Sequence, residues 1–154
     1  MILARSSSPH LHAPLDTSNV MLLVILATFP GLVALTWNFG WGSIINVTLA
    51  VIVALTCEAG IMALRKRPIM FYLRDLSAVV TALLLGLALP PLAPWWLVVI
   101  AVVSAVGIAK HLYGGLGYNP FNPAMVGYVV VLISFPVEMT TWFTPRELLA
   151  DGVL

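Results

Sequence analysis

Residues 20–37, VMLLVILATFPGLVALTW, decide the fold class of this chain. The 18 residues of this run include no charged side chain. A helix that crosses a membrane needs about 20 mainly apolar residues, because the hydrocarbon core is about 30 Å thick. The run is longer than the core of a signal peptide, and no A-x-A cleavage site follows it. We therefore interpret it as a first membrane span that the protein retains.

The composition of the whole chain agrees with this interpretation. Of its 154 residues, 61% are hydrophobic and 8% are charged, and the mean hydropathy is +1.05. Soluble domains average about 25% charged residues, so a water-soluble or disordered chain is excluded. A net charge of +1 gives no field that would attract nucleic acid. With a single cysteine, Cys57, and no CxxC or HExxH motif, the sequence predicts neither a disulfide framework nor a metal site.

Four further apolar runs follow, at residues 43–64, 76–89, 95–109 and 124–135. They lack the alternation of β-barrel strands, so we expect helices. The last three runs are short for a bilayer. Either flanking residues such as 71–73 extend the helices, or the spans are broken and depend on their neighbours. The prediction is an all-α integral membrane protein with five transmembrane helices and broken or re-entrant segments. An odd number of spans suggests one half of a ten-helix inverted-repeat bundle.

The basic residues predict how these helices are oriented. Six of the seven fall before the first run, between the second and third, or between the fourth and fifth: Arg5, Arg65, Lys66, Arg67, Arg74 and Lys110. The positive-inside rule makes this side cytoplasmic. The five tryptophans lie at the other ends of the runs, as in an interfacial aromatic belt.

This orientation divides the chain into three parts. We expect a cytoplasmic tail at residues 1–19, a five-span bundle at 20–142, and an outer segment at 143–154. The outer segment opens on the capping box Thr144-Pro145-Arg146-Glu147, which predicts a short helix. Five crossings would place residue 154 on the periplasmic side, so the chain is expected to continue, or to pair with a second half, beyond this point.

The most distinctive segment is residues 110–124, KHLYGGLGYNPFNPA. Its glycines and two Asn-Pro pairs do not suit a regular helix, so we expect an unwound or re-entrant segment, with an ordinary cytoplasmic turn as the alternative. Gly114, Gly115 and Gly117 allow a flat ligand to approach the backbone closely. Asn119 and Asn122 each offer an amide donor and a carbonyl acceptor. This combination suits the pyrimidine edge of a flavin, or ion coordination by carbonyl groups.

Two carboxylates are candidates for an ion path. Glu58 lies inside the second run, and an ionisable residue within a span is a functional hypothesis by default. The alternative is that Glu58 pairs with Arg65 or Lys66. Asp75 opens the third run, where it could face a cavity or act as a helix N-cap.

Several motifs of this chain resemble those of the D subunit of the Rnf ion-translocating electron-transport complex. That family is related to the B subunit of the sodium-pumping NADH:quinone reductase. The resemblance runs along essentially the whole chain, including residues 7–9, 17–18, 39–42, 75–78 and 90–96. It is strongest in the long and unusual stretch 110–124.

The resemblance implies a bacterial inner-membrane subunit with the other subunits of a redox pump as partners. Such complexes couple electron transfer between ferredoxin and NAD to translocation of Na⁺ or H⁺, and this chain alone would catalyse nothing. The family also implies FMN linked to a threonine of a Ser/Thr-Gly-Ala-Thr motif after the fifth span. That motif does not occur here, so this chain matches the N-terminal half. A non-covalent riboflavin in the related reductase subunit points, by the matching motif, to Asn119 and Asn122.

Two other functions fit the composition and the short spans. One is half of a small-solute transporter of the inverted-repeat type, with residues 114–122 as its substrate site. The other is a purely structural subunit for membrane assembly. Only the family motif separates the redox-pump subunit from the transporter.

Overall fold

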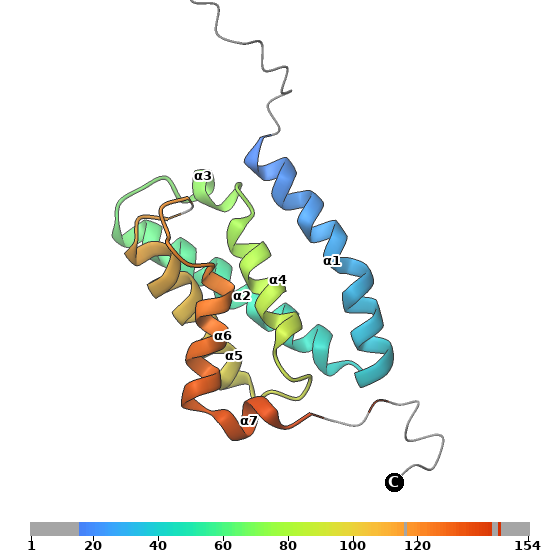
Figure 1. The fold of residues 1–154 in the computed structure, drawn as a ribbon. Helices are drawn as coiled ribbons and strands as arrows, with labels where there is room; N and C mark the ends of the chain where they lie inside the picture. Colours follow the sequence, from blue (N-terminus) through green and yellow to red (C-terminus); the bar gives the residue numbers. More distant parts are fainter. Residues whose placement is uncertain (1–15, 116, 143–144, 146–154) are drawn as a thin grey trace, which may run out of the picture.

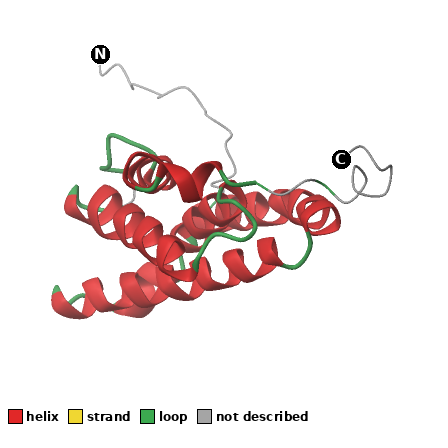
Figure 2. Cartoon of the chain, turned by 90° about the horizontal axis from the view of Figure 1, so that it is seen from below, coloured by secondary structure: helices red, strands yellow, loops and turns green. Residues whose placement is uncertain are grey.

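The computed structural model describes residues 16–115, 117–142 and 145, and every regular element within them is a helix (Figure 2). Three helices are long and apolar enough to cross a membrane. They are α1 (Thr17–Phe39), α2 (Gly42–Leu64) and the continuous helix made of α5 (Trp95–Val103) and the π-helix η1 (Ser104–Leu112). The helix α1 begins three residues before the predicted first span. The all-helical, multi-pass class predicted from the apolar runs is thus confirmed.

Two shorter apolar helices fall on the remaining runs. These are α4 (Ser77–Ala88) and α6 (Pro123–Ser134), each of 12 residues and therefore about 18 Å long. The expectation that residues 71–73 lengthen the third helix is wrong. Those residues belong to the separate helix α3 (Ile69–Leu73), because Leu76 has a φ of 59°, a left-handed conformation that an α-helix cannot contain.

The fourth run, by contrast, is longer than predicted. Its helix continues past residue 109 as the nine-residue η1, whose last residues include Lys110 and His111. Long π-helical stretches are rare and often mark functional sites. Among the described residues of the distinctive segment 110–124, the irregular ones are therefore 113–115 and 117–122, since α6 begins at Pro123.

The helices run alternately up and down the bundle (Figure 1). The C-terminal ends of α2 and η1, the helix α3 and the start of α4 meet at one end, which we call the basic end because it carries Arg65, Lys66, Arg67 and Arg74. The turn between α1 and α2, the start of α5 and the short helix α7 (Pro136–Thr140) lie at the opposite end.

The tryptophans lie at the end opposite the basic end. Trp37, Trp41 and Trp95 are largely exposed there. The ring of Trp142 makes an edge-on contact with Phe39, with ring centroids 5.9 Å apart. The separation of basic and aromatic residues expected from the sequence is therefore present in the fold. The predicted tail up to residue 15 and the predicted helix within 143–154 lie outside the described residues, apart from Pro145.

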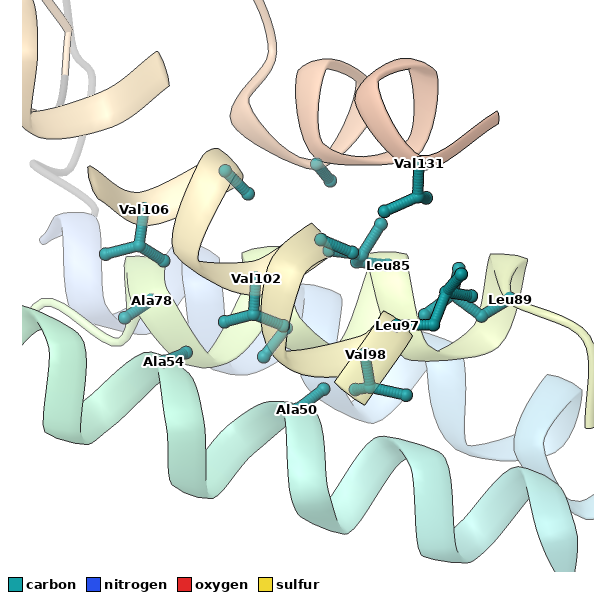
Figure 3. Close-up of a cluster of buried hydrophobic side chains, with 14 of the residues drawn as sticks. Ala50, Ala54, Ala78, Leu85, Leu89, Leu97, Val98, Val102, Val106 and Val131 are labelled. Carbon is teal, nitrogen blue, oxygen red and sulfur yellow. The ribbon is translucent and has the colours of Figure 1, made fainter. Parts of the chain in front are cut away.

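Small side chains hold the bundle together (Figure 3). They allow the helix backbones to approach one another closely, as is common in membrane proteins. Fully buried alanines lie on α2, α4, α5 and η1: Ala50, Ala54, Ala82, Ala101 and Ala105. At the periphery, α1 packs against α2 and α4 but has no buried residue. The core is therefore formed by α2, α4, α5 with η1, and α6.

Candidate functional site

The polar centre of the bundle is an ion pair between α2 and η1. The Nζ atom of Lys110 donates a hydrogen bond to Oε1 of Glu58 at 2.6 Å, and the two side chains are 3% and 0% exposed. Glu58 lies six residues before the end of α2, which is about 9 Å along the helix axis. Removing two charges from water costs several kcal/mol per ion, so this pairing is what makes their burial tolerable.

A second part of the network begins at the start of α4. The ammonium of Lys110 also donates to Oγ of Ser77 at 2.7 Å. The hydroxyl of Ser77 in turn donates to Oδ1 of Asp75 at 2.6 Å. The structure therefore connects the two carboxylates singled out from the sequence, Glu58 and Asp75, through Lys110 and Ser77.

Asp75 is held in place by the unusual turn before α4. The N-cap position of α4 is Leu76, not Asp75 as the sequence suggested as one alternative. The carboxylate of Asp75 nevertheless accepts the backbone N–H of Ser77 at 2.8 Å, so it still satisfies a free donor of the first helical turn. This contact fixes both Asp75 and Ser77 beside Lys110.

His111 lies next to the ion pair and is also buried. Its Nε2 atom is 3.6 Å from Oε1 of Glu58, which is beyond a hydrogen bond. Within the described part of the chain, neither ring nitrogen of His111 nor Oε2 of Glu58 has a hydrogen-bond partner. Buried polar atoms without partners are rare and call for an explanation. Three such atoms around one ion pair indicate a site that can accept a further polar group.

The suggested alternative that Glu58 pairs with Arg65 or Lys66 is wrong. Arg65 donates instead from Nη2 to the backbone oxygen of His111 at 2.6 Å, and this contact fastens the end of η1 to α2. Sequence reasoning used Lys110 only as a sign of orientation. One signal for its role was available: no helix-breaking residue separates Lys110 from the run 95–109, so the helix places it inside the bundle, where a cation needs a partner.

A cavity of about 560 Å³ connects this network to the basic end. Several of its lining residues are exposed, among them Asp16 before α1 and Arg74 after α3. The lining also includes Asp75, Lys110, His111 and Gly115. The cavity therefore opens at the surface of the basic end and reaches Lys110. A small cation that entered it would pass the exposed Asp16 and the half-buried Asp75 before it reached Lys110, behind which Glu58 lies.

The glycine and asparagine residues lie in the irregular loop 113–122. Gly114, Gly115 and Gly117 all have positive φ, between 84° and 108°, which side chains rarely adopt. The amide of Asn119 donates to the backbone oxygen of Phe121 at 2.7 Å. Oδ1 of Asn122 accepts the N–H of Ala124 at 2.9 Å and so caps α6. Each asparagine thus has a local structural role.

A flavin fits this loop only in part. A cavity of about 540 Å³ lies beside Asn122, with Tyr113, Phe121 and Met125 in its lining, and its apolar, aromatic walls suit a flat ring system. Asn122 lines this cavity and offers its amide nitrogen to the polar edge of such a ring, whereas Asn119, Gly114, Gly115 and Gly117 are not among the residues that line it. No residue can be assigned to covalent FMN, because the Ser/Thr-Gly-Ala-Thr motif is absent from the sequence.

Fold and site together define a multi-pass α-helical membrane protein with a buried charge network at one end of its bundle. The chain belongs to the NQR2, RnfD, RnfE family, whose model matches residues 4–153. The resemblance stated from the motifs is thereby confirmed.

Similar proteins are named as the D subunit of an ion-translocating oxidoreductase complex. The chain is 63% identical to the one from Alcanivorax borkumensis and 57% identical to the one from Aliivibrio salmonicida, in each case over 96% of its length. It is 59% identical over 99% of its length to the one from Ectopseudomonas mendocina. These matches cover 43%, 42% and 45% of the respective relatives, so the chain spans less than half of their length.

Proposed function

We propose that this chain is part of a membrane flavoprotein subunit in a complex that couples electron transfer between ferredoxin and NAD to translocation of Na⁺ or H⁺. The observation that carries the proposal is the identity of 57–63% to proteins named as the D subunit of an ion-translocating oxidoreductase complex. The chain would catalyse nothing alone. Its partners would be the other subunits of the complex and the lipid bilayer, and the large exposed hydrophobic side chains of α1, among them Leu23, Leu26 and Phe29, support such contacts.

We further propose five crossings of the bacterial inner membrane, made by α1, α2, α4, α5 with η1, and α6. The N-terminus and the basic end would face the cytoplasm, and residue 154 the periplasm. The short α4 and α6 would be completed by neighbouring protein, because a helix of about 18 Å does not cross a hydrocarbon core of about 30 Å alone. In this proposal the chain is one half of a ten-helix inverted repeat, and its share of the relatives' length supports that size.

The ion path in this proposal runs through Asp75 and Glu58. Support comes from the hydrogen-bonded connection between them and from the cavity that reaches it from the basic end. Ionisable residues inside membrane bundles commonly mark such paths. The cation would pass from the half-buried Asp75 to the buried Glu58.

The cofactors in this proposal are two flavins. FMN would be attached to a threonine that is not among these 154 residues, and a riboflavin would lie against the loop of Gly114, Gly115 and Gly117 with Asn119 and Asn122 at its polar edge. A bound flavin would supply one- and two-electron chemistry, while the protein binds and orients it. The residues of this chain would hold the ring and keep water from it.

The decisive experiment separates ion movement from electron flow. Glu58→Gln is introduced into the full-length subunit, and the complex is purified and reconstituted into vesicles. We expect ion uptake per electron transferred to fall, while electron transfer continues. Glu138→Gln, a carboxylate of α7 at the opposite end, is the matched control and should leave the ratio unchanged. Equal loss of both activities with poor assembly would support a purely structural subunit instead.

Flavin fluorescence of the denatured full-length subunit in a gel tests the flavoprotein assignment. A fluorescent band that disappears on replacement of the attachment threonine supports covalent FMN. A protein without any fluorescent band favours the solute transporter.

A further inference from the structure

Lys110 lies between the buried carboxylate of Glu58 and the cavity that opens at the basic end. Its ammonium binds Oε1 of Glu58 at 2.6 Å and Oγ of Ser77 at 2.7 Å, and its side chain also lines the cavity. A cation that reached Glu58 from the cavity would therefore meet the ammonium on the same oxygen atoms. Carboxylate and hydroxyl oxygens are also the ligands that small hard cations prefer.

We propose that Lys110 is a tethered cation that competes with the translocated cation for Glu58. While its ammonium is on Glu58, the carboxylate is neutralised and the path is closed. When the translocated cation takes Glu58, the ammonium moves toward Asp75. This inference rests on the proposed ion path and adds to it the residue that controls occupancy.

The charges of the network leave room for this exchange. The hydrogen-bonded side chains contribute two carboxylates, Glu58 and Asp75, and one ammonium. Their formal sum is one negative charge, so one additional monovalent cation would make these three side chains neutral. Arg67 and Arg74 also line the cavity, but both are exposed to solvent and neither is hydrogen-bonded to these three side chains. Asp75 lines the same cavity as Lys110 and offers the displaced ammonium a second partner. Lysine suits this role because its compact charge sits on a flexible four-carbon stem.

An incoming cation finds ligands among the buried polar atoms without partners: the carboxylate oxygen Oε2 of Glu58 and one ring nitrogen of His111, since a neutral imidazole carries its proton on the other nitrogen. Oε2 of Glu58 and both ring nitrogens of His111 have no hydrogen-bond partner within the described residues. The Nε2 atom of His111 lies 3.6 Å from Oε1 of Glu58, so these atoms surround the ion pair. An arriving Na⁺ or proton can therefore bind Glu58 before the ammonium has fully left.

The test measures the cation dependence of the complex that carries the full-length subunit, reconstituted into vesicles. Electron-transfer rate is followed against Na⁺ concentration at fixed pH, and against pH at fixed Na⁺. The parent complex should respond to one of these two cations, and that titration is then repeated with the variants. Lys110→Met should lower the cation concentration that gives half of the maximal rate by about tenfold, which is within the usual range of coupling between sites. Lys110→Arg should raise it, because a guanidinium binds a carboxylate with two hydrogen bonds and is the stronger competitor.

Opposite shifts in the two variants are a result that a merely structural role of Lys110 would not produce. A lower maximal rate with an unchanged half-maximal concentration in both variants overturns the proposal. The proposal is also overturned if Glu58→Gln/Lys110→Met lowers the half-maximal cation concentration as much as Lys110→Met does, because the effect would then not act through Glu58. If the complex with Lys110→Met does not assemble, Lys110→Arg decides: a higher half-maximal cation concentration supports the proposal, and an unchanged or lower one overturns it. A parent complex that responds to neither cation overturns the proposed function itself, which is a separate and recognisable outcome.

Discussion

Glu58 and Lys110 are 52 positions apart in the chain, yet their charged atoms are 2.6 Å apart and shielded from solvent. The pair joins α2 to the π-helix η1 in the half of the bundle nearest the basic end. A charge that loses its only counter-ion in such a place is far more costly than the absence of both charges. The pair therefore makes the stability of the bundle depend on matched charges at these two positions.

The first prediction concerns this dependence. Lys110→Met should destabilise the protein by about 3–5 kcal/mol, because the carboxylate of Glu58 remains buried and unpaired. Glu58→Gln/Lys110→Met should recover most of the loss. The measurement is thermal unfolding of the purified complex in detergent. Lys66→Met makes the same chemical change at an exposed site and should have little effect. A double variant as unstable as Lys110→Met would mean that packing of the lysine stem, and not charge pairing, stabilises this region.

The second prediction concerns the buried Asn46 of α2. Its Nδ2 atom donates to the backbone oxygen of Pro90 at 2.8 Å and so ties α2 to the turn between α4 and α5. Asn46→Ala should cost about 1–3 kcal/mol, since it leaves a buried carbonyl without its partner. Asn38→Ala removes a bond of the same kind at an exposed position and is the control. Equal melting temperatures for the two variants would show that the turn does not depend on Asn46.

The positions of the main helices could be predicted because long apolar runs leave few alternatives in a membrane. The observed ends of α2 and α6 fall within about one residue of the predicted runs, within the usual uncertainty of helix boundaries. The break that separates α3 from α4 could not be predicted, because it depends on the left-handed Leu76, a residue with no preference for that conformation. The π-helix was equally hidden, because the sequence 104–112 has no proline, and a single glycine, Gly107, does not distinguish a π-helix from an ordinary helix.

The candidate site could be predicted only as separate residues. Glu58 and Asp75 stand out because carboxylates are rare in apolar runs. Their connection through Lys110 and Ser77 requires three elements to pack together, and the spacing in the sequence favoured the nearer Arg65 as a partner for Glu58. The side-chain oxygen of Asn122 accepts a hydrogen bond at the start of α6, as a helix cap does. The amide group of the same side chain also suggested ligand binding. Tertiary packing, and not local pattern, decides between such roles.

The third prediction separates these two roles of Asn122. Asn122→Asp keeps the oxygen that accepts the N–H of Ala124, and a negative charge is favourable at a helix N-terminus, so stability should be unchanged. It removes the amide donors, so bound riboflavin should be lost. Asn122→Ala should lose the flavin and also about 0.5–2 kcal/mol of stability. The measurement is the flavin released by acid from the purified complex, compared with the flavin that stays attached to protein.

The matched control for this experiment is Asn38→Asp, an exposed site on α1 far from the loop. It should leave the released flavin unchanged. The riboflavin proposal fails if the released flavin is unchanged in Asn122→Asp and also in the variant with alanine at both Asn119 and Asn122. The asparagines would then be structural residues of the loop and of α6 alone.

The fourth prediction tests the close helix contacts that place the site. A Cβ atom at Gly86 would lie 2.9 Å from the Cα atom of Val47, and one at Gly127 would collide with the backbone oxygen of Ala101. Alanine at either position should therefore force α4 away from α2, or α6 away from α5, at a cost of about 1–3 kcal/mol. Gly60 of α2 has no atom within 4 Å of the same position. Gly60→Ala should be neutral or stabilising by about 0.5–1 kcal/mol, because alanine is the better helix former.

Thermal unfolding of the purified complex measures all three glycine variants. Because α4 carries Ser77 and α2 carries Glu58, we also expect Gly86→Ala to weaken coupling of ion uptake to electron transfer, while Gly60→Ala leaves it intact. A Gly86→Ala complex as stable and as well coupled as Gly60→Ala would contradict the packing of α4 against α2. The short distances between Glu58, Lys110 and Ser77 would then lack their structural basis, since they require that packing.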